Sequence, residues 1–126
     1  MGRVVLVTGV GRYLGARAAA LLADDPGVDR VLAVDLVPSR FPLGRAEFVR
    51  ADIRSPVIAK ILTRGDIDTV VHMNVLATPT AAGGRAPQKE INVIGTMQLL
   101  AACQRATALR SIVVKSSTTV YGASPK

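Results

Sequence analysis

One stretch near the amino terminus decides the fold: VVLVTGVGRYLG, residues 4–15. Its first four residues are apolar and mostly β-branched, which is typical of a strand buried on both faces of a parallel sheet. A glycine-rich turn follows from Thr8 to Gly15, and the Ala- and Leu-rich sequence from Leu14 to Ala23 predicts a helix. A strand, a turn and a helix in this order predict a βα unit of a parallel sheet.

The same unit recurs along the chain. Ser55 and Pro56 open a second helix, with serine as the N-cap and proline at the first helical position, and Gly65 ends it. Further strands are expected at residues 30–35, 46–50, 68–73 and 111–115, and helices at 55–64 and 88–106. Because strands that alternate with helices join through right-handed crossovers, we expect an α/β fold. It would be one domain, residues 1–126, with a Rossmann-type doubly wound parallel sheet that stops after about five strands.

The glycine-rich turn is a candidate phosphate-binding site. Gly9 permits a tight turn, Gly11 can let the backbone approach a pyrophosphate, and Gly15 lets the helix pack close to the strand. The helix N-terminus then offers free N–H groups and a partial positive charge to the phosphates. The candidate cofactor-binding residues of this segment are Thr8, Gly9, Gly11, Arg12, Tyr13, Leu14 and Gly15.

An acidic residue strengthens the case for a dinucleotide cofactor. Asp35 lies 20 residues after Gly15, at the end of the second expected strand, where a carboxylate accepts hydrogen bonds from the adenosine ribose. A carboxylate also repels a 2′-phosphate, so the sequence favours NAD. NADP stays open as the alternative, because Arg12 or Arg40 could bind that phosphate.

Composition argues against several classes of partner. The net charge is +7, but the arginines are scattered singly from Arg3 to Arg110 and aromatic side chains are few, so we expect no nucleic-acid partner. One histidine and one cysteine cannot build a zinc site, and no metal is expected. Cys103 lies in an Ala- and Leu-rich stretch and is expected to be buried and inert.

The sequence also carries an expectation about location. No apolar run approaches the roughly 20 residues that span a bilayer. The segment from Met1 to Val7 leads directly into a strand and lacks the basic region, long apolar stretch and cleavage site of a signal peptide. We therefore expect no membrane partner and a cytoplasmic protein.

Six segments in order resemble one known family. They are a TGxxGxxG-like turn at Val7–Gly15, a strand and ribose acid at Ala33–Asp35, a D-[IL] pair within Ala51–Arg54, a fourth strand at Val70–His72, an NVxGT motif at Asn92–Thr96 and an SSxxVYG-like segment at Ser116–Gly122. Together they resemble the N-terminal part of the extended short-chain dehydrogenases/reductases. Within that group, the sequence resembles the NAD-dependent epimerase/dehydratase family typified by UDP-galactose 4-epimerase.

The resemblance implies roles for further residues. Ser117 would be the catalytic hydroxyl, bonded to a substrate hydroxyl or developing carbonyl while hydride moves to or from the nicotinamide. Asp52 and Ile53 would lie beside the adenine of the cofactor. Asn92 would be a buried polar contact near the active site. The implied partner is a small-molecule substrate, such as a nucleotide sugar.

Departures from the family pattern shape the functional prediction. Arg12 stands where the family has its middle glycine, and Met73–Ala77 lacks the residues that follow the histidine in galactose epimerases, which leaves the substrate open. The Y-x-x-x-K dyad of the family is missing, since Tyr121 is followed by Lys126 at the wrong spacing. We therefore expect a truncated chain that binds cofactor without turnover.

Two alternatives remain open at this point. One is a non-catalytic NAD(P)-binding or sensor protein of the same fold, and the other is a steroid-type or other small-molecule dehydrogenase. The helix expected at 88–106 resembles the element through which family members dimerise, so we also predict a homo-oligomer.

Overall fold

The structure is a computed structural model that describes residues 2–64, 66–73 and 90–115, with side chains from residue 93 onward in the last range. The elements, in chain order, are β1 (Arg3–Thr8), α1 (Tyr13–Ala23), β2 (Val28–Asp35), β3 (Glu47–Arg50), α2 (Pro56–Arg64), β4 (Thr69–His72), η1 (Glu90–Gly95), α5 (Thr96–Arg105) and β5 (Ser111–Val114). Strands and helices alternate through the described residues except at β2 and β3, which follow each other without a helix, and this order agrees with the sequence prediction.

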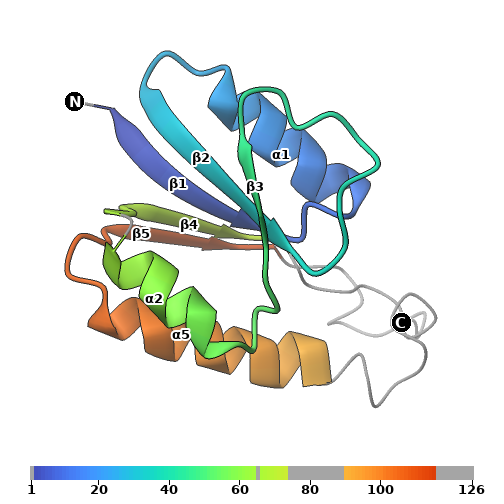
Figure 1. Cartoon of the computed structure of the whole chain (residues 1–126). Helices are drawn as coiled ribbons and strands as arrows, with labels where there is room; N and C mark the ends of the chain where they lie inside the picture. The colour runs from blue at the N-terminus through green and yellow to red at the C-terminus, as the bar shows by residue number, and fades with distance from the viewer. Residues whose placement is uncertain (1, 65, 74–89, 116–126) are drawn as a thin grey trace, which may run out of the picture.

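The strands form one parallel sheet in the order β3-β2-β1-β4-β5. The chain builds outward from β1 to β3 on one side and then returns to place β4 and β5 on the other side of β1. Helix α1 covers one face of the sheet, and α2 and α5 cover the opposite face (Figure 1). This arrangement is a doubly wound Rossmann-type sheet, which confirms the predicted fold class, and its order reverses between β1 and β4.

The core lies on both faces of the sheet and explains the apolar run in β1. Val5 and Val7 pack with Ala19 of α1, whereas Leu6 packs on the other face with Ile58 of α2 and Leu99 of α5. These three β1 side chains are at most 1% exposed. A central parallel strand needs apolar residues at consecutive positions because helices cover it on both sides.

The predicted helix at 88–106 differs from the structure. It consists of the π-helix η1 followed by α5, and the two meet at Gly95 and Thr96. A Cβ at Gly95 would lie 3.2 Å from Cγ2 of Ile53, so glycine lets this helix approach the segment after β3 closely. Glycine is also a weak helix former, and wide π turns interrupt α-helices at such positions.

Smaller differences concern the ends of strands. β2 begins two residues before the predicted Arg30, at Val28, and β4 covers only Thr69–His72. The second helix begins at Pro56, and the Ser55 side chain accepts a hydrogen bond from the Val57 N–H at 3.2 Å, as expected of an N-cap. Cys103 is buried, and burial raises the pKa of its thiol.

Candidate functional site

The turn after β1 is tight and is tied to the neighbouring strand. Gly9 has a φ of +78°, which glycine adopts readily, and its N–H donates to the carbonyl oxygen of Val34 in β2 at 3.0 Å. The N–H of Arg12 donates back to the carbonyl oxygen of Gly9 at 3.3 Å. The turn therefore holds the start of α1 at the carboxyl ends of β1 and β2.

Gly15 is required by the packing of α1 on this turn. A Cβ at position 15 would overlap the carbonyl oxygen of Gly9, which is backbone and cannot move aside alone. The first turn of α1 consequently rests directly on the glycine turn. The sequence predicts a close approach here, and the structure has one.

The N-terminus of α1 has the properties of an anion site. Its N-cap, Arg12, has extended backbone and makes no side-chain capping bond, and the first turn contains no acidic residue. The first N–H groups of a helix lack intrahelical acceptors and carry a partial positive charge. Tyr13 and Leu14, which supply two of them, are exposed. The backbone N–H groups at this end of α1 can therefore donate hydrogen bonds to the oxygens of a phosphate.

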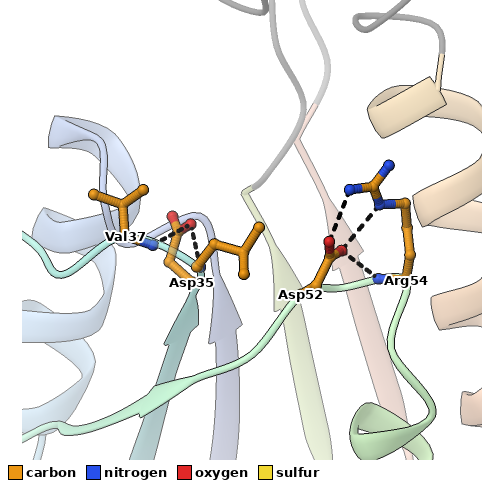
Figure 2. A network of polar contacts seen from close by, with 5 residues as sticks. Asp35, Val37, Asp52 and Arg54 are labelled. Carbon is orange, nitrogen blue, oxygen red and sulfur yellow. Dashed lines mark hydrogen bonds and ion pairs between the residues drawn. The ribbon is translucent and has the colours of Figure 1, made fainter.

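Asp35 ends β2 and is held by backbone amides. Its Oδ2 accepts the Gly11 N–H at 2.8 Å. Its Oδ1 accepts the Leu36 and Val37 N–H groups at 2.7 and 3.4 Å, and Figure 2 shows the Asp35 and Val37 side of this contact. A Cβ at Gly11 would lie 2.9 Å from Oδ2 of Asp35. Glycine at position 11 thus makes room for this carboxylate, a reason that the sequence analysis did not foresee.

Asp52 follows β3 and pairs with a residue two positions later. Its Oδ1 accepts the Arg54 backbone N–H at 2.8 Å and Nε at 3.0 Å, and its Oδ2 accepts Nη2 at 2.7 Å (Figure 2). These hydrogen bonds lower the pKa of the Asp52 carboxyl. Ile53 lies between Asp52 and Arg54 in the sequence, and its buried side chain packs in the core beside Gly95. The side chain of Ile53 is therefore part of the core and is not exposed for contact with a ligand.

A buried polar chain links β1, β4 and α5, and the sequence analysis missed it. The ring of His72 contacts Thr8 Oγ1 through Nδ1 at 2.7 Å and Thr96 Oγ1 through Nε2 at 2.9 Å. The Met73 N–H donates to the same Thr8 oxygen at 3.1 Å. His72 is fully buried, and burial lowers the pKa of its imidazole to about 4. A lone histidine at the end of an apolar strand is the signal that could have drawn attention to it.

The structure brings some predicted residues together and leaves others apart. The Gly11 N–H of the glycine turn donates to Asp35, whereas Asp52 accepts hydrogen bonds from its own neighbour, Arg54 (Figure 2). The glycine turn, Asp35, Asp52 and Ile53 lie at the carboxyl ends of β1, β2 and β3, where parallel sheets of this type bind ligands.

Two predicted residues cannot be placed in the same detail. Ser117 lies outside the described residues. Asn92 falls within η1, four residues before Thr96, and its side chain is not among those described.

The residues proposed for an alternative cofactor phosphate, Arg12 and Arg40, are both exposed. Tyr13 packs edge-on against Phe41, with ring centroids 5.5 Å apart.

Two classes of feature are missing from the described part of the chain. Within residues 2–64, 66–73 and 90–115, no three His, Cys, Asp or Glu side chains gather in a way that could hold a metal ion. Over those same ranges, no helix has the length and apolar character to cross a membrane.

Comparison with known proteins identifies relatives along the whole chain. The model of the NAD dependent epimerase/dehydratase family matches residues 5–126. The uncharacterized protein Rv0501 of Mycobacterium tuberculosis (strain ATCC 25618 / H37Rv) is 53% identical over 127 residues. That match covers 98% of this chain and 34% of the mycobacterial protein, so the chain spans about a third of its relative's length.

Two further relatives have names that state an activity or a ligand. UDP-glucose 4-epimerase of Klebsiella pneumoniae is 32% identical, over 97% of this chain and 94% of that protein. The solved structure of MoeE5 in complex with UDP-glucose and NAD matches with a TM-score of 0.77 and 30% identity, over 98% of this chain and 39% of that one. With its parallel sheet, glycine turn and matched residues 5–126, the chain belongs to the NAD-dependent epimerase/dehydratase family.

Proposed function

We propose that this chain binds NAD across the carboxyl ends of β1, β2 and β3. One observation carries the proposal: α1 begins without a side-chain cap or an acidic residue, directly on a turn where Gly15 has no room for a Cβ. Residues Thr8–Gly15 would bind the pyrophosphate through backbone N–H groups. A helix end without its own cap is suited to an anionic ligand.

The other candidate residues extend the proposed site along the cofactor. Asp35 would accept hydrogen bonds from the adenosine ribose, and its negative charge would disfavour the 2′-phosphate of NADP. Asp52 and the backbone of Ile53 would lie near the adenine. Preference for NAD agrees with the NAD dependence that defines the family.

For the whole protein we propose a reaction at a hydroxyl or ketone of a small substrate, with a nucleotide sugar as the class of molecule. The Klebsiella relative is named for an epimerase activity on UDP-glucose, and MoeE5 was solved with UDP-glucose and NAD, which supports this class. NAD supplies hydride acceptance and return at its nicotinamide. Ser117 stays the proposed catalytic hydroxyl, and Asn92 the proposed polar contact near it.

Fluorescence titration of the purified chain with NADH and NADPH tests the cofactor proposal. We expect NADH to bind at least about tenfold more tightly than NADPH, equivalent to ~1.4 kcal/mol. Asp35→Asn retains an oxygen acceptor for the Gly11 N–H and removes the charge, so it should weaken NADH binding and narrow the preference between the two cofactors.

Asp29 offers a matched control on the same strand. It is an exposed aspartate at the opposite end of β2, where its carboxylate accepts the Gly2 N–H at 3.0 Å. Asp29→Asn should leave both affinities unchanged. Failure of the unmodified chain to bind NADH, or tighter binding of NADPH, contradicts the proposal.

A further inference from the structure

His72 is fully buried, and neither the glycine turn nor the two carboxylates of the proposed cofactor site include it. Its ring nitrogens contact Thr8 Oγ1 at 2.7 Å and Thr96 Oγ1 at 2.9 Å, and its backbone carbonyl accepts the Lys115 N–H at 3.0 Å. Thr8 closes β1 and opens the glycine turn, Thr96 begins α5, and Lys115 follows β5. One residue at the end of β4 therefore connects three other elements of the carboxyl edge.

The protonation state of the ring fits a structural connection. With the pKa lowered to about 4 by burial, the ring is neutral near pH 7. A neutral imidazole has one donor and one acceptor nitrogen, and a threonine hydroxyl can serve as the partner of either. Both ring nitrogens are therefore partnered by hydroxyl groups that are well suited to a neutral ring. An unpartnered polar group in this position would carry a cost of desolvation.

The Thr8 hydroxyl also receives the Met73 N–H at 3.1 Å, so it contacts both the ring and the backbone of β4's last residues. These contacts join the last residues of β1 and β4, where Thr8 and His72 are partners in the parallel ladder, at the point where the sheet order reverses. Ligands of parallel α/β sheets bind at that point. The residue that opens the glycine turn is therefore bonded through its hydroxyl to the His72 ring.

We propose that His72 is a positioning residue for the cofactor, which sets the glycine turn through Thr8 and anchors α5 through Thr96. The inference rests on the NAD binding proposed above. The two ring nitrogens have different roles in this proposal. The Nδ1 contact with Thr8 supports cofactor affinity, and the Nε2 contact with Thr96 supports the stability of α5 on the sheet. A purely structural histidine would have no such division.

Two substitutions separate the nitrogens. The side chain of His72→Asn places a polar atom near the position of Nδ1 and retains the contact with Thr8, whereas His72→Gln reaches toward the position of Nε2 and retains the contact with Thr96. Each loses one buried hydrogen bond, so thermal melting should detect similar losses of stability. NADH titration should detect a difference: about tenfold weaker binding for His72→Gln and a change within about twofold for His72→Asn.

Three threonine variants keep the test valid if the histidine variants do not fold. Thr8→Val should weaken NADH binding about as much as His72→Gln does, and Thr8→Ser should restore it, because serine returns the hydroxyl. Thr96→Val removes the other partner and should lower the melting temperature with NADH affinity within about twofold. Equal affinities for Thr8→Val and Thr96→Val overturn the inference.

The outcomes for the two proposals differ. If the unmodified chain does not bind NADH, the proposed function fails and the inference fails with it. If the unmodified chain binds NADH and the Asn and Gln variants bind it equally, only the inference fails. As His72 is the chain's single histidine, its ¹⁵N-labelled ring gives an unambiguous spectrum, which should show a neutral ring at pH 7 in the unmodified chain. A protonated ring at that pH also overturns the inference.

Discussion

The carboxyl edge of the sheet is built in two different ways on its two sides. Beside β2, the glycine turn and Asp35 are joined almost wholly through backbone amides, with Gly11 and Val37 donating to the carboxylate. Toward β4 and α5, side chains bond to side chains, as His72 does with its two threonines. The first region depends on glycines and backbone amides gathered around one carboxylate, and the second depends on pairs of polar side chains.

The difference indicates how each region fails. Where backbone approaches backbone, any added carbon collides and there is no flexible group to move aside. Where polar side chains pair inside the core, removal of one partner leaves the other unsatisfied. Substitutions should therefore damage the glycine turn by steric overlap and the β4 side by unpaired polarity.

Gly15→Ala should have the largest effect. Its Cβ would overlap the Gly9 carbonyl oxygen, so α1 must move off the turn, and we expect a loss of at least about 3 kcal/mol of folding free energy. Chemical denaturation measures this loss. Gly27→Ala is the control, because the nearest atom to its Cβ is the end of the Asp25 side chain. Equal stability of the two variants contradicts the packing described for α1.

The second-largest effect is expected from acidification, which should lower the free energy of unfolding through His72 at the end of β4. The His72 ring has a pKa of about 4 when folded and 6.5 in the reference state, so between these values the unfolded chain binds a proton that the folded chain does not. Stability is full above about pH 6.5 and falls as the pH decreases toward 4, by up to ~3 kcal/mol. Denaturation at several pH values checks the slope, which should flatten in His72→Asn. An unchanged slope in that variant would assign the loss to other groups.

Substitution of an arginine in an ion pair should have the smallest effect on stability. Two such pairs can be compared. Arg54→Met breaks the partly buried pair with Asp52, whose side chains are 34% and 26% exposed, and should cost about 1 kcal/mol. Arg30→Met breaks the pair with Glu47, which is about half exposed, and should cost less than about 0.5 kcal/mol. Thermal melting of both variants tests the order, and a larger loss for Arg30→Met contradicts it.

The sequence predicts those features of the fold and of the site that depend on residues close together in the chain. The alternation of strands and helices, the turn at Gly9 and the acid at Asp35 are encoded by short-range spacing, and the predicted fold class is confirmed. The chain's relation to the NAD-dependent epimerase/dehydratase family is confirmed as well. The role of each candidate residue in binding stays a prediction.

The remaining contacts depend on register between distant segments. Thr8 and His72 are 64 residues apart, and His72 and Thr96 are 24 apart, so only the packed sheet brings them together. The close approach of Gly95 to Ile53 likewise joins segments that are distant in the sequence. The pair between Asp52 and Arg54 is local, but nothing in its spacing distinguishes an ion pair from two solvated charges.

The hydrogen bond between the Gly11 N–H and Asp35 has a consequence for attempts to re-engineer cofactor preference. The carboxylate both holds the turn and would repel a 2′-phosphate, so a large cation at position 35 would remove the acceptor on which Gly11 relies. A redesign toward NADP needs an oxygen acceptor retained at position 35 and a positive group supplied from elsewhere, with exposed Arg40 as the starting point. Selectivity and the shape of the turn must therefore be altered as a coupled pair.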